Sequence, residues 1–300
     1  MSRSNIFVEN RSSKGGSDAD VTVGIPAFNS DETIGQSIDS ILAQSFRNLR
    51  LLISDNASED NTGEECLKRV RRDSRVHYIR QTSNIGVFEN YNELFLKCKS
   101  KYFKWQSSSD WCDKNFIESC VDALESNQDA VLAYTEVTLV DEAGNLERYT
   151  GDFGLHMDDP ADRFRYFLNN LQLCNVFNGV IRTDALRGTR LNGQFQGSDS
   201  PLLAELALKG KFVLIREPMW YRRMTPATMS KLKSAEQREE FFSGSLHYDR
   251  YVIWKRMSSL FGSVLRSEIG WRSKIKCLAY LIRKSCWVRG KLWREAVQEL

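Results

Sequence analysis

Closely spaced cysteines and histidines are missing from this 300-residue chain. None of the three histidines has a cysteine or another histidine at the spacing of zinc ligands, which argues against a zinc site. The seven cysteines are scattered, without a CxxC pair, as is typical of reduced thiols in a cytoplasmic protein and not of a disulfide framework. From this we expect a cytoplasmic location.

Long hydrophobic runs are missing as well. No stretch reaches the roughly 18 apolar residues of a membrane span, so we expect no transmembrane helix. Residues 1–19 lack the apolar core of a secretion signal, and their Ser, Gly, Asp and Lys content predicts a disordered N-terminal tail. The net charge is only +3, which gives no electrostatic reason to expect a nucleic-acid partner.

The glycine-rich signatures of common nucleotide sites are absent too. The chain contains neither GxGxxG nor GxxxxGK[ST]. Both motifs work by bringing backbone N–H groups close to phosphates. A nicotinamide-dependent dehydrogenase and a P-loop enzyme are therefore disfavoured.

What the chain does have is a regular alternation of apolar runs and helical patterns over roughly its first 140 residues. Short apolar runs at 21–28, 49–56, 75–81 and 101–106 predict strands. The segments between them have apolar residues at helical spacing. This alternation predicts an α/β protein with a doubly wound, mostly parallel central sheet.

The pattern is less regular after residue 120. A strand is predicted at 130–140, a helix after Pro160 and another strand at 176–182. A further helix should end at Gly210, a typical C-cap residue, and lead into a last strand. From residue 231 onward the chain reads as helical and basic.

Polar side chains cluster where the first four predicted strands end. They are Asn29, the pair Asp55-Asn56, and the stretches 81–84 and 107–110. Ligands of such sheets bind beyond the carboxyl ends of the strands, so the coincidence predicts a ligand site. Each cluster taken alone is explained as well by a turn or a helix cap.

Four residues at or next to these strand ends suit a nucleotide. Asp55 is able to accept from a ribose hydroxyl or a base N–H, as acidic residues do in dinucleotide folds. Gly86 permits close approach of the backbone, and Arg80 and Asn84 are able to address a phosphate or a base. For each segment the alternative is an ordinary turn.

Two carboxylates and an arginine pair suit group-transfer chemistry. Asp110 follows the serines at 107–109 and is able to hold a divalent cation, which often needs only one or two protein carboxylates. Asp199 stands at a helix start, where it either caps the helix or acts as a general base. Arg222 and Arg223 are able to pair with phosphates.

Five segments together resemble the family 2 glycosyltransferases of the GT-A fold. The resemblance covers about residues 20–225 and rests on the order and spacing of the segments. They read VTVGIPAFNSDETIGQSIDSILAQSF, LRLLISDNASEDNT, RQTSNIGVFENYNELF, KYFKWQSSSDWCDKNFIESCVDAL, and GSDSPLLAELALKGKF with WYRR.

The resemblance implies transfer of a sugar from a nucleotide-diphosphate donor, with a UDP-sugar expected, to a hydroxyl of a glycan or lipid-linked acceptor in surface polysaccharide synthesis. It implies inversion at the anomeric carbon, a Mg²⁺ or Mn²⁺ ion held by Asp110, and Asp199 as the catalytic base. The nucleotide and diphosphate positions match Pro26, Ala27, Phe28, Asn29, Glu32, Asp55, Arg80, Asn84, Gly86, Ser108, Ser109, Asp110, Arg222 and Arg223.

The resemblance also divides the chain. It implies a GT-A domain over 20–230, with a nucleotide-binding half at 20–120 and an acceptor half at 121–230. A helical, basic C-terminal extension follows at 231–300.

This chain departs from the family pattern at the acidic motif. Relatives generally carry more acid before the position of Asp110, where this chain has serines, so fewer metal ligands are present. Relatives also often have a histidine after the arginine pair, where this chain has Met224 and Thr225. The alternative function is therefore a catalytically inactive module that binds nucleotide-sugars.

The C-terminal extension mixes Lys and Arg with tryptophan over residues 265–295. Basic residues and tryptophans on amphipathic helices are typical of peripheral contact with a membrane surface, here the inner face of the membrane. The alternative is that the apolar stripe packs on the catalytic domain or on a second subunit, as in a homodimer.

Overall fold

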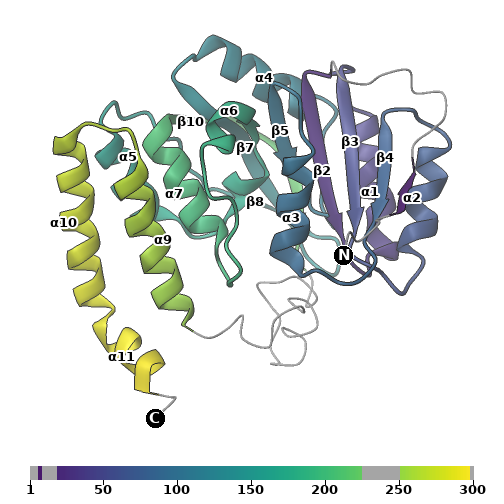
Figure 1. Cartoon of the computed structure of the whole chain (residues 1–300). Helices are drawn as coiled ribbons and strands as arrows, with labels where there is room; N and C mark the ends of the chain where they lie inside the picture. The colour runs from purple at the N-terminus through teal and green to yellow at the C-terminus, as the bar shows by residue number, and fades with distance from the viewer. Residues whose placement is uncertain (1–5, 9–18, 225–250, 298–300) are drawn as a thin grey trace.

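The computed structural model describes residues 6–8, 19–224 and 251–297. Their strands form a 10-stranded sheet with helices on both faces (Figure 1). The strand order along the sheet is β1-β4-β3-β2-β5-β9-β7-β10-β6, and β8 pairs with β7. The predicted α/β class with a doubly wound sheet is confirmed.

The first half of the sheet is parallel, as the alternating pattern predicts. β2 pairs in parallel with β3 on one side and with β5 on the other, and β3 pairs in parallel with β4. All carboxyl ends of these strands therefore meet at one edge of the sheet. The strands are β2 (Val21–Ala27), β3 (Leu49–Asp55), β4 (Val76–Arg80) and β5 (Tyr102–Trp105).

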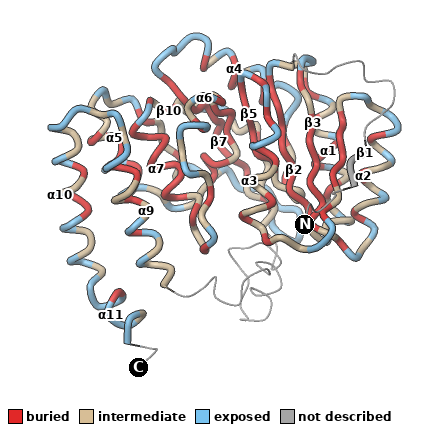
Figure 2. Tube along the Cα trace, viewed as in Figure 1, coloured by how far each residue is buried: buried red, intermediate tan, exposed pale blue. Residues whose placement is uncertain are grey.

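Both faces of the sheet are covered, because successive side chains of a strand point to opposite faces. In β3, Leu51 and Ile53 join the core cluster under α1, α2 and α4, whereas Leu52 joins the cluster under α3, α5 and α7. These buried strands appear as continuous red in Figure 2. The helices are α1 (Asp31–Leu42), α2 (Thr62–Val70), α3 (Val87–Leu96), α4 (Phe116–Ser126), α5 (Pro160–Asn170), α6 (Thr183–Arg187) and α7 (Asp199–Lys209).

The second half of the sheet is mixed. β7 and β10 pair in parallel, but β9 lies antiparallel between β5 and β7. The strand predicted at 176–182 is only partly correct, since Asn175–Asn178 forms the 3-10 helix η1 and only three residues form β9. The strands are β6 (Trp111–Cys112), β7 (Ala130–Val140), β8 (Leu146–Tyr149), β9 (Val180–Arg182) and β10 (Lys211–Arg223).

Part of the N-terminal segment is ordered. β1 (Ile6–Val8) pairs antiparallel with β4 at the edge of the sheet. This strand falls within residues 1–19, for which the sequence predicts a disordered tail. The rest of that prediction, up to residue 18, lies outside the described residues.

The C-terminal helices pack on one side of the α/β core. α9 (Val252–Arg266) packs on α7, and α10 (Trp271–Trp287) packs on α5 and α9. α11 (Arg289–Val297) contacts α9 and α10. Within the described residues no helix has the length and apolar content to cross a membrane. One face of these helices thus packs on the α/β core, as one of the two hypotheses for them requires.

Candidate active site

A cavity of about 1000 Å³ opens at the carboxyl edge of the sheet. Its wall comes from the end of β2, the residue after β3, the first turn of α3, the loop after β5, the start of α7 and the end of β10. Most of the predicted site residues line it: Pro26, Ala27, Phe28, Asn29, Glu32, Ser108, Ser109, Asp110, Asp199, Arg222 and Arg223.

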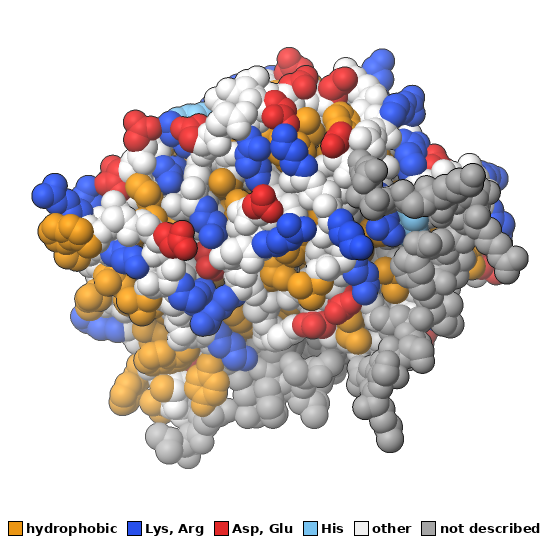
Figure 3. Space-filling model, turned by 45° about the horizontal axis from the view of Figure 1, so that its top comes forward, with side chains coloured by type: hydrophobic (Ala, Val, Ile, Leu, Met, Phe, Trp, Pro, Cys, Tyr) orange, Lys and Arg blue, Asp and Glu red, His pale blue; other side chains and the backbone are white. Residues whose placement is uncertain are grey.

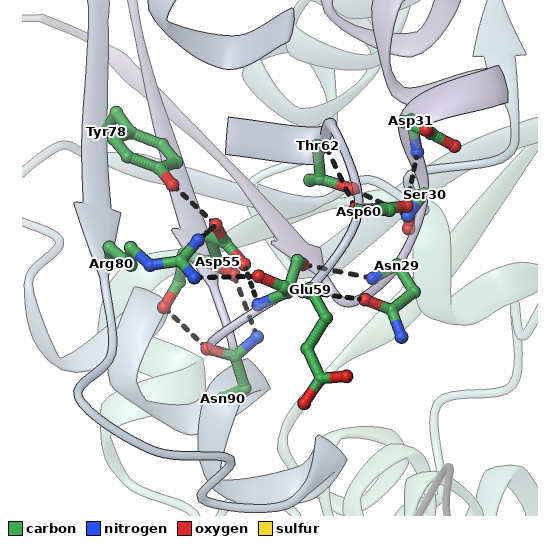
Figure 4. A network of polar contacts seen from close by, with 12 residues as sticks. Asn29, Ser30, Asp31, Asp55, Glu59, Asp60, Thr62, Tyr78, Arg80 and Asn90 are labelled. Atoms are coloured by element: carbon green, nitrogen blue, oxygen red, sulfur yellow. Dashed lines mark hydrogen bonds and ion pairs between the residues drawn. The ribbon is translucent and has the colours of Figure 1, made fainter. Parts of the chain in front are cut away.

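The loops after β2 and β3 are tied together by side-chain caps (Figure 4). The N–H of Asn29 donates to Ser58 Oγ at 3.0 Å, and Asn29 Oδ1 accepts from the N–H of Glu59 at 2.9 Å. The N–H of Ser30 donates to Thr62 Oγ1 at 2.7 Å. Asn29 itself has a positive φ of 44°, a conformation that asparagine tolerates better than most residues. These hydrogen bonds join the loops after β2 and β3 into one double loop, which forms one wall of the cavity.

Asp55 lies outside the cavity lining and is fully buried. Its Oδ2 accepts from Arg80 Nη1 at 2.7 Å and from the Tyr78 hydroxyl, and its Oδ1 accepts from the N–H of Ser58 at 2.8 Å. The pKa of Tyr78 is raised by burial and by the Asp55 carboxylate. Asp55 and Arg80 therefore hold the loop after β3, and their predicted contact with a nucleotide stays a prediction.

Asn84 and Gly86 also lie outside the lining and support Asn56, which lines the cavity. Asn84 Oδ1 accepts from Asn56 Nδ2 at 2.6 Å and from the N–H of Gly86 at 2.8 Å. Gly86 has φ 86°, which favours glycine. Asn56 belongs to the polar clusters that predict a ligand site from the sequence, although no individual role was predicted for it.

Asp110 is buried in the cavity wall, with only 5% of its surface exposed. Its Oδ1 accepts from the N–H of Arg223 at 3.0 Å and from Ser109 Oγ at 3.3 Å. Burial raises the pKa of this carboxyl to about 6, although the Arg223 N–H and the charge of Arg222 favour the ionised form. Among the described residues no hydrogen bond reaches Oδ2, so one oxygen remains available to a ligand.

The loop that carries Asp110 is fixed by Lys104, a buried residue that sequence reasoning missed. Its ammonium donates to Asn178 O at 2.8 Å and to Gln106 Oε1 at 2.9 Å. Gln106 Nε2 in turn donates to the carbonyl of Asp110 at 2.8 Å. Burial lowers the pKa of Lys104. This network joins β5 to η1, which also contributes to the cavity.

The cavity wall offers few ligands for a hard cation such as Mg²⁺ or Mn²⁺. No group of three His, Cys, Asp or Glu side chains able to hold a metal occurs in the part of the chain that the structure describes. Asp110 directly follows three serines, 107–109, and Ser30 Oγ lies 3.0 Å from Ser108 Oγ. One buried carboxylate with a free oxygen fits Mg²⁺ or Mn²⁺ when phosphate oxygens and water complete the shell.

Two arginines at the end of β10 give the wall positive charge. Arg222 Nη1 donates to Asn175 Oδ1 at 2.8 Å, and Asn175 Nδ2 donates to Asp152 Oδ1 at 3.2 Å. The guanidinium of Arg223 lies 5.2 Å from the ring centroid of Trp111, a cation–π distance. Both guanidiniums are thus held in place beside Asp110, as a diphosphate site requires.

Asp199 is the first residue of α7 and lines the cavity. Its Oδ1 accepts from the N–H of Ser200 at 2.9 Å. Its neighbour on the wall is Cys174, and both burial and the charge of Asp199 raise the pKa of that thiol. The N-cap position of α7 belongs to Ser198, so the capping role considered for Asp199 is wrong, and the role of general base stays a prediction.

Aromatic and amide side chains complete the cavity, and sequence reasoning missed them. Phe177 stacks on Trp105 with ring centroids 4.7 Å apart, and Tyr91 lies 5.6 Å from Phe177. Periodicity assigns such residues to a core, so no local signal distinguishes them. The further wall residues that sequence reasoning missed include Asn90, Asn178, Asn192, Gln196 and Trp220.

Comparison with known proteins agrees with the resemblance. The glycosyl transferase family 2 profile matches residues 22–188, more than half of the chain. An uncharacterized glycosyltransferase of Rickettsia conorii is 30% identical over 43% of this chain and 21% of its own length. A GalNAc(5)-diNAcBac-PP-undecaprenol beta-1,3-glucosyltransferase of Campylobacter jejuni is 23% identical over 72% of this chain and 69% of its own length. The chain spans about a fifth of the Rickettsia relative.

Solved structures share the fold. TarS of S. aureus in complex with UDP superposes with a TM-score of 0.64 over 88% of this chain and 71% of that chain, at 12% identity. The same protein in complex with UDP-GlcNAc gives a TM-score of 0.64. The predicted GT-A fold is thereby confirmed, and the chain belongs to glycosyl transferase family 2.

Proposed function

We propose that this protein is an inverting glycosyltransferase that moves a sugar from a nucleotide-diphosphate donor to a hydroxyl of a glycan or lipid-linked acceptor. One observation carries the proposal: Asp110, Asp199, Arg222 and Arg223 share the wall of one cavity at the carboxyl edge of the sheet. A UDP-sugar donor is supported by the fold shared with TarS in complex with UDP. A lipid-linked acceptor is supported by the name of the Campylobacter relative.

The nucleotide and the diphosphate of the donor would contact different parts of the cavity wall. The nucleotide is assigned to the double loop around Asn29 and to Asn56, whose amides offer donors and acceptors to a base and a ribose. The diphosphate is assigned to Arg222 and Arg223, with the Ser108 hydroxyl as a further donor. A Mg²⁺ or Mn²⁺ ion held by Asp110 would neutralise charge on the departing diphosphate.

Transfer follows as a single displacement. The acceptor oxygen bonds to the anomeric carbon while the bond from that carbon to the phosphate oxygen breaks, and the diphosphate leaves with the electron pair. Asp199 takes the proton of the acceptor hydroxyl. Attack from the face opposite the leaving group inverts the configuration at the anomeric carbon. A single displacement needs one base for the acceptor proton and one site for the leaving diphosphate.

A second function is favoured by one specific feature. The acidic motif has kept a single carboxylate, so a module that binds nucleotide-sugars without transferring them fits the donor side equally well. A module that only binds the donor has no use for Asp199 as a base. The two functions therefore differ in what Asp199 does.

The test compares Asp199→Asn with wild type for UDP affinity and for sugar transfer or donor hydrolysis. Loss of the base should lower turnover by about 10²–10⁴-fold while UDP affinity stays within about twofold. Asp162→Asn, at a residue outside the cavity lining, is the matched control and should behave as wild type. Turnover that is unchanged in Asp199→Asn contradicts the assignment of the base to Asp199, and a wild type that binds UDP but never turns over any donor contradicts the transferase.

Donor identity is tested separately. A thermal-shift screen of UDP-, GDP-, dTDP- and CDP-sugars with Mn²⁺ should show stabilisation by UDP-sugars, because a ligand stabilises only the state that it binds. A larger shift with another nucleotide would replace UDP in the proposal without affecting the role of Asp199.

A further inference from the structure

The outer face of the C-terminal helices has no partner in the described part of the chain. Of the 11 exposed large hydrophobic residues there, eight lie in α9, α10 and α11. Trp271, Trp287 and Trp293 are 68%, 65% and 70% exposed. Isolated exposed hydrophobic residues are ordinary, but a concentration of this kind marks an interaction surface.

α10 is apolar on two opposite faces. Cys277, Tyr280 and Leu281 are buried against the α/β core. Ile275 and Ile282 lie on the opposite side of the helix and are 56% and 58% exposed. Their spacing of seven residues places them on one stripe. Packing on the catalytic domain thus uses only one of the two apolar faces.

The outer face is also basic. Between Ile269 and Arg294 the sequence contains eight Lys or Arg residues and no Asp or Glu. Two of the eight are engaged with the α/β core, because Lys276 pairs with Asp159 and Lys284 donates to Leu168 O. Arg272 and Arg283 lie over the rings of Trp271 and Trp287, at 5.5 and 5.0 Å from the ring centroids. In the described part of the chain no carboxylate pairs with either guanidinium. In Figure 3 hydrophobic and basic side chains gather at the left-hand end, where α10 and α11 lie.

This face, made of the exposed residues of α10 and α11, reaches the cavity side of the molecule at its α11 end, whereas the start of α10 lies at the other end, where Ser273 Oγ donates to Asp159 Oδ1 at 2.8 Å. Trp254 Nε1 donates to Leu292 O at 3.1 Å, and the N–H of Ile253 donates to Glu295, so α11 is held at the start of α9. Less than one turn later, Arg256 Nη2 donates to Ser200 Oγ at 2.8 Å, beside Asp199. Figure 1 shows α11 on the side to which the carboxyl ends of β2 and β3 point.

We propose that the outer face of α10 and α11 docks on an anionic lipid surface. Tryptophan and isoleucine side chains enter the boundary between headgroups and acyl chains, and the unpaired cations contact anionic headgroups. A second copy of this chain is the less suitable occupant, because a symmetric contact would bring two basic faces together. Docking in this way holds the cavity near the surface, where a lipid-linked acceptor of the proposed reaction would be found.

The test measures binding of the full chain to sedimenting vesicles of phosphatidylcholine alone and of phosphatidylcholine with phosphatidylglycerol. Wild type should bind only the anionic vesicles, and less at high salt. The variant Arg272→Gln/Arg289→Gln/Lys291→Gln should bind about a hundredfold more weakly, because each basic residue near the surface contributes about fivefold. Trp287→Ser/Trp293→Ser should also lose binding, and brominated lipids should quench wild-type tryptophan fluorescence more strongly than that of the variant.

The matched control, Arg71→Gln/Arg72→Gln/Lys99→Gln, removes the same charge from exposed positions on other elements and should bind as wild type. Equal binding by all variants, or none by wild type, overturns the proposal. A wild-type dimer that becomes a monomer in the tryptophan variant overturns it in favour of a second copy. No sugar donor is needed, so failure here leaves the proposed transferase standing.

Discussion

Two aspartates at strand ends have opposite surroundings, and this difference determines their chemistry. Asp55 receives a guanidinium, a phenol and a backbone N–H, and is therefore a satisfied structural anion. Asp110 is almost as buried, but from the described residues it receives one backbone N–H and one hydroxyl only. Its ionised form is therefore incompletely compensated, which is typical of a carboxylate that awaits a ligand.

This imbalance predicts a pH dependence. The pKa of Asp110 rises from 3.8 to about 6, so folding favours its protonated form. That contribution to stability is complete below the unfolded pKa and is lost as pH rises through about 6. Binding of a cation needs the opposite form. UDP affinity in the presence of Mn²⁺ should therefore weaken about tenfold for each pH unit below about 6.

Calorimetric titrations at several pH values, with and without Mn²⁺, check this dependence. Asp110→Asn should remove the effect of Mn²⁺ at every pH. Asp162→Asn, at a residue outside the cavity lining, is the control and should keep the effect of Mn²⁺. If Asp110→Asn keeps it as well, the assignment of the cation to Asp110 is wrong.

At the scale of elements, β9 decides how the two halves of the sheet join. Its three residues pair antiparallel with both β5 and β7. Just before it, Gly179 passes so close to β7 that an added Cβ would lie 2.7 Å from the carbonyl oxygen of Ala133. The approach is possible because glycine has no side chain.

Gly179→Ala should therefore lower the free energy of unfolding by about 1–3 kcal/mol, because backbone has to move to admit the methyl group. Gly290→Ala is the control: a Cβ there meets nothing within 4 Å, and alanine suits a helix. Urea unfolding of both variants measures the difference. Equal stability of Gly179→Ala and wild type would show that the backbone near β9 admits the methyl group without a loss in the free energy of unfolding.

At the scale of the whole molecule, the C-terminal helices belong to the core and are not an appended tail. Six side chains of α9 and α10 are buried in the same cluster as α5 and α7: Met257, Leu260, Val264, Cys277, Tyr280 and Leu281. Burial of each contributes about 1.5–3 kcal/mol, so together they match the entire stability margin of a typical domain.

A chain that ends at residue 250 should accordingly unfold at a much lower temperature or aggregate. A chain that ends at residue 288 loses only α11, with one buried hydrophobic side chain, Leu292, and should keep a cooperative transition close to that of wild type. Thermal unfolding followed by circular dichroism distinguishes the two truncations. Wild-type stability of the shorter chain would show that the helices are dispensable for folding.

The sequence by itself determined the parallel half of the sheet and most of the cavity wall. Strand ends and helix starts are local signals, and the carboxyl ends of parallel strands must meet at one edge. Asp110 could therefore be predicted to lie at that edge from its place after a strand, whereas the roles of Asp110 and Asp199 were implied only by the family resemblance. Their segments are also those that carry the family resemblance.

Tertiary structure decided the rest. Three contacts depend on residues far apart in sequence: the hydrogen bond of Tyr78 to Asp55, the hydrogen bond of Lys104 to Asn178 O, and the entry of β9 between β5 and β7. Likewise α10 shows apolar residues on two faces, and only packing reveals which one remains outside. Periodicity fixes the side of a helix on which a residue lies, but contacts between distant segments decide what that side meets.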